Sequence, residues 1–443
     1  MKTLRLLVAA AGALGAVLIL APVRASSTFR TLAARTVAPA AMAPAEDEVI
    51  VQFRDAADER AMGDAMHLAG GRSVRRSGFG KRFLVSLDAG FDAAEAMSRL
   101  RTLPAVEYAE RNGRVHASQS RPGFLTPNDV FYRAQWNLRL VDAERTWGIQ
   151  TGSSDVIVAV LDTGVAFEDF GPFRKAPDWG GTRFVGGFDF VHEDSHPNDD
   201  EFHGTHVAST IAEATNNREG MAGLAFGCAI MPVKVLDQEG NGSFFDVAEG
   251  VDFAVRNGAK VINLSLGGPT NSNTMQQAVD RAVQAGVTVV AAAGNDGVGR
   301  VDFPAALPNV IAVGAVDGRK ALAPYSNFGS QIDVVAPGGD GDRDDDHDQL
   351  PDAVFQQMPD PDFVAIGRFD VFDYFGLQGT SMATPHVSAL AALLYSQGIT
   401  QPAAVQAAIE QSAEDLGAAG RDDRFGHGLI RPSQALRGLG LAR

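Results

Sequence analysis

The sequence is poor in cysteine and in basic residues. Its only cysteine is Cys228, so no disulfide can form within the chain, which excludes a disulfide-stabilised scaffold. Lys and Arg number 38 against 54 Asp and Glu. Such an acidic chain lacks the basic face that phosphates require, and we expect no nucleic-acid partner. The composition, 45% hydrophobic and 21% charged, is instead that of a globular protein with a substantial core.

Long hydrophobic runs are missing after residue 23. The one such run, residues 6–23, follows Lys2 and Arg5. It ends at Val23-Arg24-Ala25, which offers a small-residue site for removal of a signal peptide. This pattern predicts a signal peptide over residues 1–25, and hence a secreted protein with no stable membrane anchor. An uncleaved anchor is the alternative. The Ala-, Pro- and Thr-rich residues 26–47 are predicted to be a linker.

The first part of the chain after this linker has the pattern of a small α+β unit. Apolar runs and helical periodicity alternate over about 65 residues, with strands at 49–53, 83–87 and 106–108 and helices at 55–68 and 92–103. We assign residues 48–115 to this unit and residues 116–124, rich in Ser and Gly, to an exposed, cleavable link.

From residue 125 to 443 strands and helices alternate. Residues 156–161, 261–264 and 287–292 are continuous apolar runs, as expected of strands covered on both faces. Residues 245–257 and 274–285 have helical periodicity and are followed by glycine. We therefore predict an α/β fold with a mainly parallel sheet flanked by helices in three layers. In such sheets the functional site lies at the carboxyl ends of the strands.

Three segments carry the residues of acyl-transfer chemistry. Asp162 ends an apolar run, His203 opens the segment His-Gly-Thr-His-Val, and Ser381 lies in Gly-Thr-Ser-Met-Ala-Thr-Pro-His. Each alone is compatible with a cap or turn residue. Together they supply a nucleophile, a base and an orienting acid. The chain lacks the Gly-x-Ser-x-Gly elbow of lipase-type hydrolases.

In these motifs and their order the chain resembles the subtilisin-like serine proteases, the subtilase family, and in particular its thermitase-like branch. The resemblance extends over residues 127–436. It implies that Ser381 attacks the peptide carbonyl, that His203 is the general base, and that Asp162 orients it. It also implies an oxyanion hole formed by the side chain of Asn295 and the backbone N–H of Ser381, and leaves His206 and His386 as structural residues.

The same resemblance implies a substrate groove. Ser265, Leu266, Gly267 and Gly268 correspond to the segment that pairs with the substrate backbone, and Phe244 to a wall of an apolar pocket. Asp296, next to Asn295, could favour basic substrate side chains or could simply be solvated.

The unit at 48–115 resembles the family's ferredoxin-like inhibitory prosegment. The expected protein is thus a secreted endopeptidase, made as a zymogen that processes itself and acting on polypeptides as a monomer. Its own prosegment would serve as intramolecular inhibitor and folding aid. The alternative is a catalytically inert subtilase-fold protein that binds peptides.

Acidic segments indicate structural calcium, although each could also be a solvated loop. By resemblance, a first site takes side-chain oxygens from Asp129, Asp178 and Asn217 and carbonyls from Ala214, Glu219 and Met221. A second site lies in the acidic insertion at 339–376, where the spacing selects Asp344, Asp346, Asp348 and Asp352 with the carbonyl of Leu350. A third, weaker candidate comprises Asp189 and Asp194, although His192 and His196 stand where oxygen ligands are usual.

Overall fold

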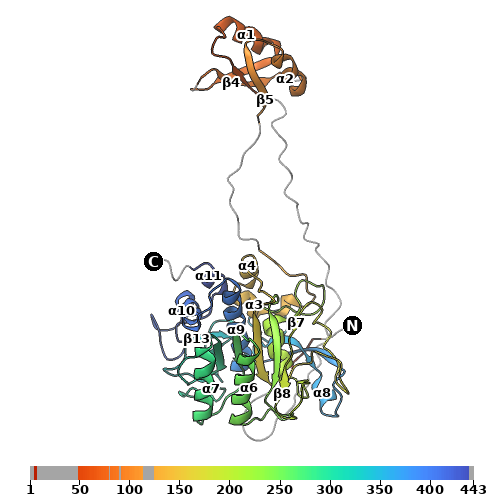
Figure 1. Cartoon of the computed structure of the whole chain (residues 1–443), viewed down its shortest axis with the longest axis vertical. Coiled ribbons are helices and arrows are strands. Elements are labelled where there is room, and N and C mark those ends of the chain that lie inside the picture. Colours follow the sequence, from red (N-terminus) through yellow and green to blue (C-terminus); the bar gives the residue numbers. More distant parts are fainter. Residues whose placement is uncertain (1–3, 7–47, 79, 89–90, 113–123, 439–443) are drawn as a thin grey trace. The chain divides into compact units, whose positions relative to one another are not determined.

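A computed structural model describes residues 4–6, 48–78, 80–88, 91–112 and 124–438. The chain divides into two compact units, one formed by Ser27–Arg121 and the other by Met1–Ser26 with Pro122–Arg443 (Figure 1). Apart from residues 4–6, the predicted signal peptide lies outside the described residues, as do the linker at 26–47 and most of the link at 116–124. These boundaries therefore remain predictions.

The smaller unit is a four-stranded antiparallel sheet with two helices. Its order is β2 (Glu48–Phe53), α1 (Glu59–Leu68), β3 (Gly71–Arg76), β4 (Arg82–Leu87), α2 (Ala93–Arg101) and β5 (Val106–Arg111). The strands lie in the order β3-β4-β2-β5, which is the predicted ferredoxin-like arrangement. Alternate residues of β2 are buried, as expected for a sheet with one covered face.

Two local features of this unit differ from the sequence prediction. Strand β3 was not predicted, because its sequence Gly-Arg-Ser-Val-Arg-Arg is polar and lies at the edge of the sheet, where little burial is required. Helix α1 begins at Glu59 rather than at residue 55. The carboxylate of Asp58 accepts the N–H of Ala61, and this N-cap sets the start of the helix.

The larger unit is built on an eight-stranded parallel sheet. Its strands are β6 (Ile157–Asp162), β7 (Arg183–Phe184), β8 (Phe188–Asp189), β9 (Ala229–Lys234), β10 (Val261–Leu264), β11 (Thr288–Ala292), β12 (Val310–Val316) and β13 (Val334–Pro337). They follow the order β13-β12-β11-β10-β6-β9-β7, with β8 also beside β9. The strands from β9 to β13 are buried at every residue, which explains why their sequences are continuous apolar runs.

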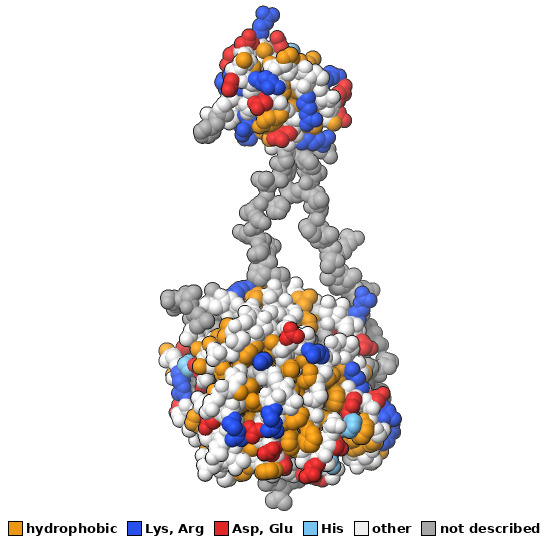
Figure 2. All heavy atoms as spheres, in the orientation of Figure 1, with side chains coloured by type: hydrophobic (Ala, Val, Ile, Leu, Met, Phe, Trp, Pro, Cys, Tyr) orange, Lys and Arg blue, Asp and Glu red, His pale blue; other side chains and the backbone are white. Residues whose placement is uncertain are grey.

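Helices cover this sheet and complete the predicted three layers. The longer ones are α5 (His203–Ala212), α6 (Phe244–Arg256), α7 (Asn273–Gln284), α9 (Thr380–Ser396) and α10 (Pro402–Ser412); the short ones are a 3-10 turn (Tyr132–Ala134), α3 (Trp136–Leu140), α4 (Ala143–Trp147) and α11 (Pro432–Ala435). Helices α6 and α7 lie side by side (Figure 1), whereas α9 packs on α5 and on β10 to β13. On the face seen in Figure 2, charged side chains of both signs are interspersed with hydrophobic ones.

Much of the acidic insertion is regular structure. Strands β14 (Val354–Pro359) and β15 (Phe372–Leu377) form an antiparallel hairpin around α8 (Pro361–Val364). A short strand near the N-terminus, β1 (Leu4–Leu6), pairs parallel to β15. Among the described residues, we find no helix with both the length and the hydrophobicity needed to span a membrane.

Candidate active site

The carboxylate of Asp162 and the imidazole of His203 are in direct contact. Asp162 is the last residue of β6 and is fully buried, while His203 is the first residue of α5. The distance from Asp162 Oδ1 to His203 Nδ1 is 2.7 Å. Because a buried carboxylate accepts the Nδ1–H, the opposite ring nitrogen is left as the site that can accept a proton.

Negative charge surrounds His203. Burial of the ring disfavours its charged form, but Asp162, Glu201 and Asp199 outweigh this and raise the pKa of His203 to about 9. The side chain of Glu201 bends back toward the start of α5. Its Oε2 accepts the N–H groups of Phe202 and His203, both at 2.7 Å. The backbone around the imidazole is thereby fixed by an acidic side chain that the sequence analysis did not select.

Ser381 lies in the first turn of α9 and contacts the segment that follows β10. Its hydroxyl donates to the carbonyl of Ser265 at 3.1 Å, and the Ser265 hydroxyl donates to the carbonyl of Ser381 at 2.9 Å. Ser381 and His203 are both among the described residues, and no hydrogen bond joins them. The structure therefore shows the acid–imidazole pair directly and holds the serine against the Ser265 segment.

Asn295 follows β11 and faces the start of α9. Its Oδ1 accepts from the backbone N–H of Thr380 at 2.8 Å and from the Thr380 hydroxyl at 2.9 Å. Within the described chain, this leaves the amide nitrogen of Asn295 available as a donor. A Cβ placed on Gly379 would lie 3.6 Å from both Asn295 Nδ2 and the backbone nitrogen of Ser381. The two predicted oxyanion donors thus border the same space, which glycine leaves open.

A hollow of about 480 Å³ lies beside His203. Its lining includes His203 and all five predicted groove residues, namely Ser265, Leu266, Gly267, Gly268 and Phe244. Gly268 exchanges two backbone hydrogen bonds with Phe303 at 2.8 and 2.9 Å, so that part of the segment already has a strand partner. Phe244 is 44% exposed at the start of α6 and gives the hollow an apolar wall.

Two further histidines from the same motifs are structural, as the resemblance implied. His206 and His386 are completely buried. His206 Nε2 lies 2.9 Å from the carbonyl of Val354, and His386 Nδ1 lies 2.9 Å from that of Met382. Burial lowers the pKa of His206 to about 3 and that of His386 to about 4. Both rings therefore pack as neutral core groups.

Comparison with known proteins identifies the family. Residues 153–428 match the subtilase family, Peptidase S8, and residues 33–112 match the fervidolysin N-terminal prodomain. The chain belongs to the subtilase family. The resemblance predicted from the three motifs is therefore confirmed, and the protein is a subtilisin-like serine protease with a prodomain.

Relatives and solved structures agree with this assignment. The subtilase is 36% identical over 382 residues to a thermophilic serine proteinase from Bacillus sp. (strain AK1), covering 86% of this chain and 85% of the relative. It is 39% identical to thermitase from Thermoactinomyces vulgaris, covering 67% of this chain and 94% of thermitase. A protease structure from Pseudoalteromonas arctica superposes with a TM-score of 0.61 at 30% identity, over 71% of this chain and 99% of the other.

The first calcium site of the subtilase was predicted around Asp129 and Asp178. Both are buried against the loop at 214–221. Asp129 accepts the N–H of Asn216 at 2.7 Å, while Asp178 accepts the side-chain amide of Asn217 at 2.6 Å and the N–H of Met221 at 3.0 Å. Asp129 and Asp178 thus both contact this loop, which carries the third side-chain candidate, Asn217, and the predicted carbonyl donors Ala214, Glu219 and Met221.

The charge balance of this pocket suits a cation. Glu213, which the sequence analysis missed, is fully buried beside the carboxylate of Asp178. Burial raises the pKa of Asp129 to about 6, and burial together with the charge of Asp178 raises that of Glu213 well above its usual value. Within the described residues, no Lys or Arg pairs with these three acids. Hard oxygen donors around uncompensated negative charge fit calcium.

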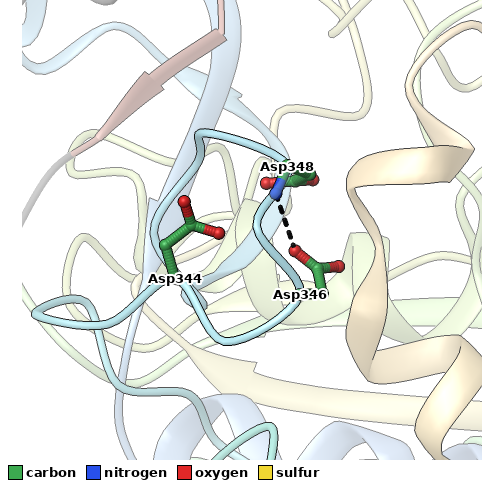
Figure 3. Close-up of side chains that lie close together, drawn as sticks. All are labelled: Asp344, Asp346 and Asp348. Atoms are coloured by element: carbon green, nitrogen blue, oxygen red, sulfur yellow. Dashed lines mark hydrogen bonds between the residues drawn. The ribbon is translucent and has the colours of Figure 1, made fainter.

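The acidic insertion brings three of its predicted ligands together. Ligand oxygens of Asp344, Asp346 and Asp348 lie within 4.8 Å of one another on a single loop (Figure 3). Asp346 also pairs with Arg139 at 2.8 Å, whereas Asp344 Oδ1 is buried and has no hydrogen-bond partner in the described part of the chain. Asp352 accepts the N–H of Asp345 at 2.8 Å, and Leu350 donates its N–H to Asp348 at 2.8 Å. The cluster of Asp344, Asp346 and Asp348 therefore fits a hard cation better than the five predicted ligands, which also include Asp352 and the carbonyl of Leu350.

The third predicted calcium site comprises Asp189 and Asp194, whose carboxylates face hydrogen-bond donors. Asp189 accepts the N–H groups of Val191 and His192 and faces His192 Nδ1 at 2.9 Å, while Asp194 accepts the N–H of His196. Among the residues described, the three aspartates of the insertion are the one group of three or more metal-binding side chains within 4.8 Å. Asp189 and Asp194 are therefore held by donors of their own loop.

The surroundings of His203 lead to a pH prediction. The imidazole can accept a proton only when neutral, and its pKa is raised from 6.5 to about 9. We therefore expect kcat/KM to increase with pH, with its acid limb displaced above 6.5 toward 9. Hydrolysis of a neutral peptide measured from pH 5 to 11 tests this. An acid limb centred at or below 6.5 would contradict the proposed electrostatic effect.

Proposed function

We propose that this subtilase is a secreted endopeptidase that cleaves peptide bonds through Asp162, His203 and Ser381. The observation that carries the proposal is the 2.7 Å contact between Asp162 and His203 at the edge of the sheet where Ser381 and Asn295 also lie. A buried acid paired with an imidazole, beside a serine and two N–H donors, is the set of groups that acyl transfer requires.

The chemistry follows from the positions of these groups. Ser381 attacks the scissile carbonyl, and His203 takes its proton and later returns a proton to the leaving amine. Asp162 holds the imidazole and stabilises its charged form. Asn295 and the backbone N–H of Ser381 donate to the oxyanion, with help from the positive end of the α9 dipole. Water then hydrolyses the acyl-enzyme by the same exchange of protons.

Covalent labelling tests this function against the inert alternative. A serine-directed fluorophosphonate should lose fluoride to Ser381 Oγ and add the mass of one phosphonyl group to the mature protein, at the peptide that contains Ser381, and abolish hydrolysis of casein. Ser396, in the same helix, should remain unlabelled. A protein that binds peptides but neither reacts nor hydrolyses them would support the inert alternative and overturn the proposal.

We further propose that the prodomain keeps the enzyme inactive until the chain cuts itself between residues 111 and 124. The match of residues 33–112 to a subtilase prodomain supports this. The prodomain would then be an intramolecular inhibitor and folding aid, and polypeptides the substrates. We expect the mature enzyme to be a monomer.

Calcium completes the proposal as a structural ion. When bound, it would neutralise buried carboxylates at the Asp129–Asp178 loop and at Asp344, Asp346 and Asp348, and the chemistry at Ser381 would not involve it. Because the chain has no disulfide, ion binding is the cross-link available for holding surface loops in place.

Chelation should reveal this stabilisation. A ligand that binds only the folded protein at a hundredfold excess over Kd stabilises it by about 2.7 kcal/mol. In a domain of this size that corresponds to a fall in Tm of about 5 °C on adding EGTA. The melts are made with the Ser381→Ala variant to prevent self-digestion.

An Asp178→Asn variant is the matched comparison for that experiment. It should melt lower in calcium and lose part of its response to EGTA, because one carboxylate of the first site is gone. If EGTA leaves the Tm of the parent protein unchanged, the structural role of calcium is wrong.

A further inference from the structure

Among the described residues that line the hollow beside His203, Glu201 is the one acidic side chain. The other lining residues, apart from His203 itself, are neutral, and they include Leu236, Phe244 and the segment Ser265–Gly268. Glu201 therefore provides the negative charge of a hollow that Phe244 and His203 also line.

The carboxylate of Glu201 is held in place by backbone N–H groups, and the nearby basic group that acts on it is the imidazole of His203. One oxygen, Oε2, accepts the two N–H groups at the start of α5, at 2.7 Å each. Among the described residues, no Lys or Arg forms an ion pair with Glu201. The side chain of Glu201 is half-buried and lines the hollow.

Burial strengthens the attraction between the Glu201 carboxylate and a cation. Burial, followed by the charge of Asp199, raises the pKa of Glu201 to about 7. Asp199 itself is engaged by the hydroxyls of Thr163 and Thr205 below the groove. A carboxylate in such surroundings gains more from a cationic neighbour than one in open water, because solvent screens the pair less.

We propose that Glu201 selects substrates that carry a lysine or arginine side chain on the acyl side of the scissile bond, close to His203. The inference rests on the proposed endopeptidase function and adds a substrate class to it. The acyl side is indicated because Glu201 lines the same hollow as the Ser265–Gly268 segment and Phe244.

Asp296 is a weaker candidate for the same role. It lies next to Asn295, and the sequence alone left open whether it favours basic substrate side chains or is simply solvated. In the structure, however, Arg300 lies 3.3 Å from Asp296 and also 3.3 Å from Asp302. A cationic substrate would have to compete with an arginine of the enzyme at Asp296, but not at Glu201.

A peptide series tests the proposal. Fluorogenic substrates are compared that differ only by Lys, Gln or Met at each of the four positions before the cleaved bond. The mature wild-type enzyme should prefer Lys over Gln by about tenfold in kcat/KM at one of these positions, the value of one charged hydrogen bond. In Glu201→Gln the Lys-to-Gln ratio should fall to about one, and Glu239→Gln, an exposed change of the same charge, should leave the ratio unaltered.

Ratios are compared at a single pH, so that any change in the His203 pKa cancels between substrates. Raising NaCl to 1 M should reduce the ratio in the wild-type enzyme, which gives a second readout if Glu201→Gln fails to fold. No preference for Lys in the wild type, a preference that survives in Glu201→Gln, or a ratio insensitive to salt would overturn the inference. Failure to cleave any peptide would instead contradict the proposed function.

Discussion

Replacing Ser381 by alanine should abolish proteolysis and leave the precursor uncut. The hydroxyl of Ser381 makes one hydrogen bond, to the carbonyl of Ser265, and it lies in the first turn of a helix that alanine suits. The variant should therefore fold. We expect kcat to fall by a factor on the order of 10⁶, the cost of removing the nucleophile in subtilisin.

The precursor provides a second measurement of the same variant. Purified wild-type precursor should convert to a shorter form cut between residues 111 and 124, whereas the Ser381→Ala precursor should persist. A trace of active wild-type enzyme should cut the variant at the same place. Ser396→Ala, which changes another serine of α9, serves as the control and should mature normally. If pure Ser381→Ala protein matures without added enzyme, self-processing by this serine is wrong.

The second large effect is expected for Asp162→Asn. The substitution keeps the shape of a fully buried side chain and removes its charge. The amide can present an N–H to His203 Nδ1, which favours the wrong imidazole tautomer. From the known cost of this change in serine proteases, we expect kcat to fall by about 10⁴.

The pH profile separates this explanation from simple misfolding. Among the groups that raise the pKa of His203, Asp162 has the largest effect. Its removal should move the residual acid limb from near 9 toward or below 6.5. Asp155→Asn, an exposed change just before β6, should alter neither rate nor profile. A decrease in kcat without any displacement of the limb would contradict the proposed role of Asp162.

Raising the pKa of His203 also links protonation to stability. A histidine whose folded pKa lies above its unfolded value stabilises the fold below pH 6.5, and this contribution is lost as the pH rises through about 9. The proposed enzyme would therefore gain activity over the same interval in which this contribution to stability declines.

Parts of the fold could be predicted because burial leaves a signature in the sequence. Strands β6, β10 and β11 are covered on both faces, so their apolar runs predict them almost to the residue. Strand β3 and the hairpin of β14 and β15 lack such a signature. Polar residues of β3 lie at a sheet edge, and Gln356 and Gln357 of β14 are buried although they are polar.

The sequence by itself determined the family and the type of fold, because chemistry restricts which side chains can occupy such motifs and burial restricts which residues can form the strands. Only the tertiary structure decided which charges are neutralised. Asp296 and Glu201 look alike as acidic neighbours of motif residues, but Arg300 pairs with the first and no Lys or Arg of the described chain pairs with the second. Glu213 likewise directly follows the apolar end of α5, and its burial beside Asp178 results from packing between distant segments. Charge pairing depends on distances in space, which residue order does not specify.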